Sequence, residues 1–278
     1  MLSYQQNKVL KLPDNGIDKN RTGGIALGDG TFFGGIAEGE PLNRFYGYVA
    51  TGIIETEEQA ANANYDALSR LPQKGAKRVG DYEWADRNGD GQITTADQFC
   101  LGVTVPPFTG GLQNSFRLKN WTLSLYLDWA TGHSIFDESY SRYFYGTFTN
   151  NYALAKDVLK AWKKPGDKTK YAKFYANDSN WGNDNYNRSP TNTFTYKGDY
   201  LCLREITLQY SLPSKLFTKV GLKGVTLTVS GNNLCYLTEV KGISPETGAS
   251  TTYEGSGDNA YYNYPPIRRF SFGVRLIF

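Results

Sequence analysis

Strict alternation of apolar and polar residues over positions 121–130 is the feature that most constrains this fold. One row consists of Trp121, Leu123, Leu125, Leu127 and Trp129, and the other of Thr122, Ser124, Tyr126, Asp128 and Ala130. Successive side chains of a β-strand point to opposite sides of the backbone. A period of two therefore predicts a strand with one apolar and one polar face.

Residues 108–118 repeat this alternation less regularly, and Lys119 and Asn120 separate the two stretches. We therefore expect an antiparallel hairpin with a tight turn at these two residues. The apolar row has tryptophan at both ends and leucine between, the order typical of a strand that crosses a bilayer. A strand of about 10 residues tilted by about 45° is long enough to cross the hydrocarbon layer. A soluble antiparallel sheet with one solvated face is the alternative that this hairpin leaves open.

Three later segments alternate in the same way and are predicted as strands. They span residues 203–212, 225–235 and 268–278, and the last one is the sequence RRFSFGVRLIF. Further upstream, residues 38–54 are predicted as a strand, and Val9 to Leu12 as the end of another. Two helices are expected in the connections: residues 55–71, and a piece with Leu154, Val158 and Trp162 at helical spacing.

The connections between the predicted strands alternate in length. They are long at 54–107, short at 119–120, long at 133–197, intermediate at 213–223 and long at 236–267. Outer-membrane barrels have short periplasmic turns and longer extracellular loops. The pattern predicts an all-β, antiparallel fragment of a transmembrane β-barrel, with about six strands, long extracellular loops and its last residue on the periplasmic side. Residues 1–37 are expected to hold a partial upstream strand and loop, and 38–278 the barrel.

Composition excludes several other classes of protein. The 278 residues carry a net charge of +3, so nothing indicates a nucleic-acid-binding surface. His133 is the single histidine, which argues against a histidine-based metal site or a Ser-His-Asp triad. Asp128, Asp137 and Glu138 show no spacing that suggests the paired carboxylates of a glycoside hydrolase. We therefore expect no enzymatic activity.

The N-terminal sequence MLSYQQNKVLKL contains no basic start, apolar core or small-residue cleavage site of a secretory signal. A protein of the outer membrane needs such a signal. The chain is therefore expected to be either cytosolic or the C-terminal part of something longer.

Residues 86–97, DRNGDGQITTAD, have the spacing of a calcium-binding loop. Gly91 allows the sharp turn, and hard oxygen ligands around it suit Ca²⁺, the single cofactor that the sequence suggests. The candidate ligands are Asp86, Asn88, Asp90, Gln92 through its carbonyl, Thr94 and Asp97. The alternative is a turn stabilised by Asx side chains without an ion.

Two further features leave alternatives open. Cys202 and Cys235 lie on strands expected to be neighbours, so a disulfide between them and two free thiols both remain open. With Cys100 the chain has three cysteines, an odd number, and they are not spaced as metal ligands. Within the connection 133–197, the stretch 176–189 places aromatic residues beside Asn and Asp. It is a candidate for binding polar ligands such as sugars, and the alternative is a solvated loop.

Six segments together resemble one family, the SusC/RagA-type TonB-linked (TonB-dependent) outer-membrane transporters, over its C-terminal part. They occur in the family's order from residue 38 to the end, and they are EGEPLNRFYGYVATGI (38–53), GDYEWADRNGDGQITTADQFCLGVTVPPFTGGLQNSF (80–116), WTLSLYLDWATGHSIF (121–136), GDYLCLREITLQYSLPSKL (198–216), VTLTVSGNNLCYLTEVKGISPE (225–246) and YPPIRRFSFGVRLIF (264–278).

The resemblance implies a barrel of about 22 strands with a plugged lumen in the outer membrane. It also implies a SusD-like surface lipoprotein as partner, energy from the TonB complex through an N-terminal part, and import of oligosaccharides or peptides. The plug and the TonB-contacting segment are absent from this sequence, so a truncated fragment is expected. The resemblance does not identify any ligand-binding residue in this sequence. A soluble β-sandwich that binds glycans and carries a Ca²⁺ loop is the alternative function.

Overall fold

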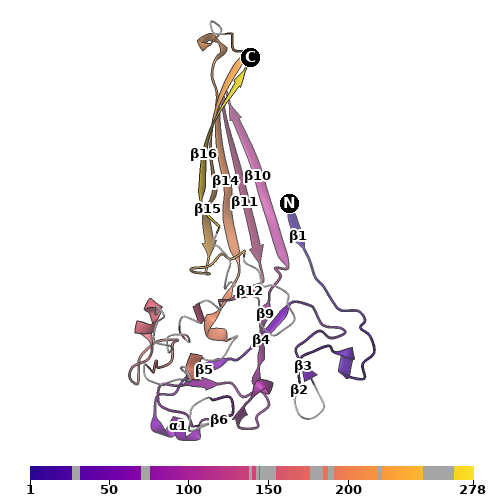
Figure 1. Ribbon diagram of the computed structural model, residues 1–278, viewed down its shortest axis with the longest axis vertical. Coiled ribbons are helices and arrows are strands. Elements are labelled where there is room, and N and C mark those ends of the chain that lie inside the picture. The colour runs from indigo at the N-terminus through magenta and orange to yellow at the C-terminus, as the bar shows by residue number, and fades with distance from the viewer. Residues whose placement is uncertain are drawn as a thin grey trace.

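The computed structural model consists of one long antiparallel sheet, which we call the wall, and a head of short elements at one end of it (Figure 1). It describes residues 1–26, 32–69, 76–137, 140–141, 144, 155–175, 184–186, 191–217, 221–246 and 266–278. No helix in these ranges is both long enough and apolar enough to cross a membrane.

Six strands form the wall, in the order β1-β10-β11-β14-β15-β16, and every neighbouring pair is antiparallel. They span Leu2–Tyr4 (β1), Phe108–Leu118 (β10), Trp121–Thr131 (β11), Tyr200–Ser211 (β14), Gly224–Thr238 (β15) and Arg269–Ile277 (β16). The predicted turn is confirmed, because only Lys119 and Asn120 separate β10 from β11 and Lys119 has a φ of 51°. The long connections leave the wall at the head end, and the short ones lie at the far tip (Figure 1).

The register of the wall joins the apolar rows of its strands into one continuous face. Residues opposite one another across a ladder lie on the same side of a sheet. Leu127 lies between Leu112 and Leu203, and Leu123 between Phe116 and Leu208. The row continues to β16 through the pairs Leu208–Val229, Val229–Phe272, Leu227–Val274 and Val225–Leu276.

A β-bulge at Arg204 keeps β14 in phase with this face. Leu201 and Leu203 are odd-numbered apolar residues, whereas Ile206 and Leu208 are even-numbered. Arg204 is the extra residue, because Leu127 pairs with Leu203 while Tyr126 pairs with Glu205. One inserted residue shifts the alternation by one position, so both halves of β14 present their apolar side chains to the same face.

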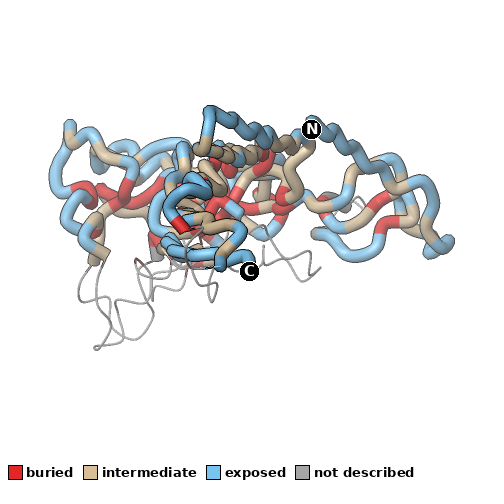
Figure 2. Tube along the Cα trace, turned by 90° about the horizontal axis from the view of Figure 1, so that it is seen from above, coloured by how far each residue is buried: buried red, intermediate tan, exposed pale blue. Residues whose placement is uncertain are grey.

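The apolar face is not covered by a second layer among the described residues. Leu112 is 51% exposed, Phe116 54% and Phe272 82%. Burial concentrates instead in the inner segments of the head, shown in red in Figure 2, whereas the strands of the wall are mostly intermediate or exposed. A soluble β-sandwich would bury such rows against a partner sheet, so the described structure does not support the sandwich alternative.

The head is built from short elements. Its strands are β2 (Ile25–Ala26), β3 (Phe32–Phe33), β4 (Arg44–Gly47), β5 (Ala50–Ile53), β6 (Tyr65–Asp66), β7 (Tyr82–Trp84), β8 (Gln92–Ile93), β9 (Phe99–Val103), β12 (Ser134–Phe136) and β13 (Thr195–Lys197). Its helices are α1 (Glu57–Asn62) and the 3₁₀ turns η1 (Asp18–Asn20), η2 (Thr95–Asp97), η4 (Lys156–Lys160), η5 (Asp184–Tyr186) and η6 (Asn192–Phe194), while η7 (Ser214–Leu216) lies at the tip of the wall.

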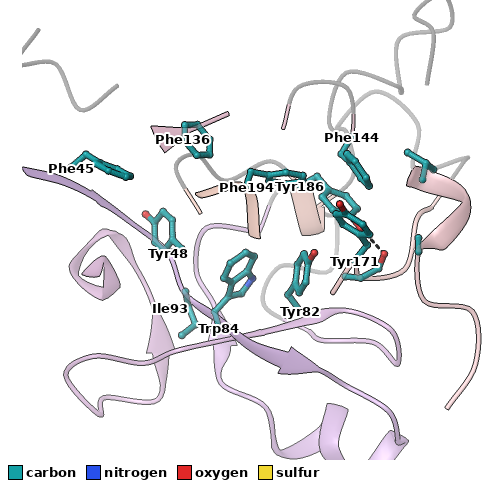
Figure 3. Packing of buried hydrophobic residues seen from close by; sticks show 13 residues of the cluster. Phe45, Tyr48, Tyr82, Trp84, Ile93, Phe136, Phe144, Tyr171, Tyr186 and Phe194 are labelled. Carbon is teal, nitrogen blue, oxygen red and sulfur yellow. Dashed lines mark hydrogen bonds between the residues drawn. The ribbon is translucent and has the colours of Figure 1, made fainter. Parts of the chain in front are cut away.

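An aromatic cluster holds together many of these short elements, among them β4, β7, β8, β12, η4, η5 and η6 (Figure 3). Phe144 stacks on Tyr171 with ring centroids 4.7 Å apart and packs against Tyr186 at 5.1 Å and Phe194 at 5.2 Å. Tyr82 lies between Tyr186 and Trp84, at 5.8 Å and 5.2 Å. Large aromatic side chains bury much area for each ordered residue. A head of two- to five-residue strands thereby gains its own core.

The prediction that 38–54 forms a single strand is wrong. This segment is divided into β4 and β5, and both lie in the head, where β4 pairs with β9 and β5 pairs with β7. Phe45 and Tyr48 are buried in the aromatic cluster. Apolar and polar residues do not alternate regularly in this segment, because its aromatic side chains pack into the core of the head rather than along one face of a sheet.

Other boundaries also differ from expectation. The strand upstream is β1 at Leu2–Tyr4 rather than Val9 to Leu12. The helix expected over 55–71 is limited to Glu57–Asn62, where Thr56 and Gln59 form a capping box. The piece at 154–162 contains the 3₁₀ turn Lys156–Lys160, and Leu154 lies outside the described residues. The long connection 133–197 also contains two short strands, β12 and β13, which pair with each other.

Candidate functional site

The polar face of the wall is the surface best suited to contact a hydrophilic ligand. The register brings hydroxyl, amide and charged side chains of five strands to this one side: Gln113, Ser115 and Arg117; Thr122, Ser124, Tyr126 and Asp128; Glu205, Thr207, Gln209 and Ser211; Thr226, Thr228, Ser230 and Asn232; and Arg269, Ser271 and Arg275. Such a surface offers both hydrogen-bond donors and acceptors.

An ion-pair network centred on Arg204 lies on this face near the head. The Arg204 Nε donates to Asp128 Oδ1 at 2.8 Å, and Nη2 donates to Asp128 Oδ2 at 2.7 Å. The same guanidinium pairs with Glu246 and donates to Asn233 Oδ1 at 2.9 Å and to the Tyr236 hydroxyl at 3.2 Å. Bidentate pairs between arginine and a carboxylate fix orientation as well as adding energy.

The chain folds so that this network joins three strands and one connection. Asp128 comes from β11, Arg204 from the bulge in β14, and Asn233 and Tyr236 from β15, where Asn233 has a φ of 53°. Glu246 follows β15 and also accepts from the Tyr236 hydroxyl at 2.8 Å. The network therefore fastens the segment after β15 onto the polar face. The side chains of Arg204 and Asp128 are 24% and 15% exposed, so they remain within reach of solvent.

His133 occupies the junction between the wall and the head. Its ring is buried, and Nε2 lies 3.3 Å from the Pro245 carbonyl oxygen. Gly198 donates its N–H to the His133 carbonyl at 2.8 Å, and a Cβ at position 198 would overlap the imidazole. Burial lowers the pKa of His133, which favours the neutral ring at neutral pH.

The residues of the candidate calcium loop are all described. Asp86 accepts from the backbone N–H groups of Gly89 and Gly91 at 2.7 and 2.8 Å. Burial alone would raise the pKa of Asp86, but the hydrogen bonds from these amides hold this pKa below its usual range. Asp90 accepts from the Gln92 N–H at 2.7 Å and from the Asn88 amide at 2.8 Å.

The last candidate ligand, Asp97, is turned inward. It is fully buried and accepts from the N–H groups of Arg87 at 2.9 Å and Thr94 at 2.7 Å, closing a capping box at η2. Among the described residues, no three side chains of the His, Cys, Asp or Glu type gather closely enough to hold a metal ion. Calcium binding at this loop stays a prediction.

The cysteines of the described chain are free thiols. Cys202 lies opposite Tyr236 and Cys235 opposite Leu203 across the β14–β15 ladder. Cys202 therefore belongs to the polar face and Cys235 to the apolar face. Their side chains point to opposite sides of the sheet, which rules out the disulfide between them.

The stretch 176–189 falls largely outside the described residues. Where it is described, its side chains serve the core of the head. Tyr186 is buried in the aromatic cluster and donates to the Ala172 carbonyl at 2.6 Å. The Asn185 amide donates to Asp81 at 3.1 Å and accepts from the Tyr82 N–H at 3.0 Å.

The Arg204 network was not predicted from the sequence. The signal that could have revealed it is the shift from odd to even apolar positions between Leu203 and Ile206. A shift of this kind indicates a bulge, and a charged residue at the bulge indicates a polar contact beside it. Asn233 and Glu246 carry no comparable local signal.

The wall is therefore of the class found in antiparallel transmembrane β-barrels, with one apolar face, one polar face and long connections at one end. No family model matches the chain. It is 29% identical over 99% of its length to the protein named TonB-dependent receptor P3 of Formosa agariphila, and 30% identical over 88% to TonB-dependent receptor P39 of the same organism. The chain spans about a quarter of the length of these relatives: 26% and 25%.

Solved structures of the RagAB peptide importer share this fold. In its open-open state the TM-score is 0.63 with 20% identity, covering 99% of this chain and 26% of that one. In its closed-closed state the TM-score is 0.60. The predicted resemblance to TonB-dependent receptors of the SusC/RagA type and the predicted barrel fold are thereby confirmed. These relatives are receptors and transporters rather than enzymes, in agreement with the prediction that the chain catalyses no reaction.

Proposed function

We propose that this chain forms the C-terminal part of the barrel of a TonB-dependent transporter, with its apolar face against lipid and its polar face lining an aqueous lumen. The single observation that carries the proposal is the separation of a mainly apolar face from a mainly polar face across the ladders from β10 to β16. Lipid-facing and lumen-facing residues alternate in barrels of this kind. The open edges of β1 and β16 would pair with further strands of the same transporter, because sheet edges are not tolerated in lipid.

The proposed orientation follows from the position of the head. Long connections lie on the extracellular side of outer-membrane barrels and short ones on the periplasmic side. The head would thus be extracellular and Phe278 periplasmic. This orientation places the head where it can meet a SusD-like surface lipoprotein and a ligand, an oligosaccharide or a peptide. The TonB complex would act from the periplasm through an N-terminal part of such a transporter.

Two arginine substitutions on adjacent residues of β11 test this proposal. Leu125 lies on the apolar face between Asn114 and Ile206, and Ser124 lies on the polar face between Ser115 and Thr207. We expect Leu125→Arg to cost about 2–4 kcal/mol if it faces the middle of the bilayer. Ser124→Arg should be tolerated because it would enter a polar lumen. The measurement is the amount of folded protein in the outer-membrane fraction.

Equal losses of folded protein in the two variants, or a greater loss with Ser124→Arg, would contradict the assignment of the faces. Ser124→Ala serves as a control for loss of the contact between the Ser115 and Ser124 hydroxyls, which lie 3.3 Å apart.

A further inference from the structure

A lysine-rich loop in the head carries the strongest positive charge of the chain. Residues 156–173 contain seven lysines and two aspartates, and the lysines are Lys156, Lys160, Lys163, Lys164, Lys168, Lys170 and Lys173. The whole chain carries a net charge of only +3. The remainder is therefore net acidic, and the positive charge is concentrated in this one segment.

The loop is closed at its base and anchored in the core. Trp162 donates its N–H to the Tyr171 carbonyl at 2.8 Å, and the Thr169 hydroxyl donates to the Lys160 carbonyl at 2.7 Å. Ala161, Trp162, Tyr171 and Ala172 are buried, the last fully. These contacts hold both ends of the loop in the head, and residues 163–168 form its tip.

Both aspartates of this segment already have hydrogen-bond or ion-pair partners. Asp157 pairs with Lys160 at 2.6 Å and accepts from the Tyr140 hydroxyl at 2.7 Å. Asp167 accepts from the backbone N–H groups of Lys163 and Lys164 at 2.9 and 3.0 Å. Across the described ranges, no carboxylate forms an ion pair with Lys163, Lys164 or Lys168, all of which are exposed. The nearby Asp167 carboxylate offsets part of the charge of Lys163 and Lys164, and the tip stays net positive.

Lys170 marks the inner border of this charged surface. Its Nζ donates to the Thr193 carbonyl at 3.0 Å and lies 5.1 Å from the ring centroids of both Tyr171 and Tyr196. Burial lowers the pKa of Lys170 and raises that of Tyr196 to about 12. The Lys170 ammonium thus has contacts at the base of the loop, although the residue as a whole is exposed.

The position of the tip favours a partner from the medium over lipid headgroups. Gly166, at the tip, donates its N–H to Glu55 Oε2 at 3.2 Å. Glu55 lies just before α1, which Figure 1 places at the end of the molecule opposite the tip of the wall. A membrane surrounding the wall would lie at the other side of the head.

The chemistry of the surface favours a chain with repeated charges of one sign. Leu159 is the only large apolar side chain exposed in the described stretch 155–175, so this stretch offers little of the apolar surface that usually holds peptide side chains. The segment contains no arginine, and lysine acts as a flexible point charge rather than a bidentate fork. Clustered charges of this kind raise the local concentration and the association rate of oppositely charged ligands.

We propose that Lys163, Lys164 and Lys168 form a capture surface for an acidic polysaccharide that carries uronate or sulfate groups along its length. This inference deepens the proposed function, and it rests on the head being the extracellular side of a transporter. Capture at this loop would concentrate the ligand beside the entrance to the lumen.

The test measures binding of polygalacturonate and dextran sulfate to the outer-membrane protein purified in detergent, at low and at high salt. The test variant is Lys163→Gln, Lys164→Gln, Lys168→Gln. The matched control is Lys119→Gln, Lys215→Gln, Lys223→Gln, which removes the same charge from exposed lysines at the opposite tip. Neutral dextran of equal length and polyglutamate are the comparison ligands. We expect the test variant to lose about tenfold or more in affinity and most of its salt dependence, with the control unchanged.

Equal affinity of the test variant and the parent protein, or equal loss in the control variant, would overturn the proposal. Binding of neutral dextran as tight as that of the acidic chains would do the same. Tighter binding of polyglutamate would assign the loop to an acidic polypeptide, such as a face of a partner protein, instead. Failure of the barrel assignment would be recognised separately, because the parent protein would then be missing from the outer-membrane fraction.

Discussion

At the scale of single residues, the segment 86–97 divides its carboxylates between the surface and the core. Asp90 is exposed and contacts only neighbours within the loop, whereas Asp97 is fully buried and closes the cap at η2. Replacing Asp97 would therefore disturb folding, whatever its role toward an ion. Asp90 is the residue at which ion binding and folding can be separated.

We expect Asp90→Ala to abolish Ca²⁺ binding to this loop while leaving the fold intact, because it removes one oxygen ligand from the D-x-N-x-D-G pattern. Isothermal titration calorimetry with Ca²⁺ measures the effect. Glu83→Ala, which removes an exposed carboxylate from β7 just before the loop, is the control. Absence of Ca²⁺ binding in the parent, or identical titrations of the parent and Asp90→Ala, would leave the loop as a turn stabilised by its Asx side chains.

At the scale of elements, the bulge in β14 links the architecture of the wall to its polar chemistry. The extra residue restores the apolar phase of the strand and places the Arg204 guanidinium among Asp128, Asn233 and Glu246. A lysine at this position has one ammonium group and cannot make these contacts at once. The fastening of the segment after β15 therefore depends on arginine in particular.

Arg204→Lys should loosen residues 239–246 by about 1 kcal/mol, a modest value because the network is partly exposed to solvent. Hydrogen–deuterium exchange should then be about fivefold faster in this segment, and unchanged in β10 and β11. Arg269→Lys, on the same polar face but without an ion pair among the described residues, is the matched control. Unchanged exchange at 239–246 in Arg204→Lys would show that the network does not hold the segment.

The wall was predictable from the sequence and the head was not, for a physical reason. Alternation over β10, β11, β15 and β16 identifies strands because each of them faces only two environments. Segment 38–54 packs several of its side chains into the aromatic cluster, so its pattern has no single period. Contacts such as Arg204 with Glu246 depend on residues brought together by register and loop closure, which local sequence does not specify.

At the scale of the whole molecule, the wall and the head obtain their stability in different ways. The head buries Phe144, Phe194 and their neighbours in a core of its own. The wall leaves its leucine and phenylalanine rows exposed, which a protein in water rarely does over so large an area. Lipid contact on one side and a water-filled lumen on the other would satisfy both faces of the wall at once.

The most direct measurement is the accessibility of spin labels placed one at a time at residues 122–127 of the protein in lipid bilayers, after replacement of the native cysteines. Labels at Leu123, Leu125 and Leu127 should collide with lipid-soluble oxygen, and labels at Thr122, Ser124 and Tyr126 with a water-soluble nickel complex. We predict that the two accessibilities alternate with a period of two and in opposite phase. Alternation in the reverse phase, or odd-numbered labels shielded from both reagents by a second layer of protein, would contradict it.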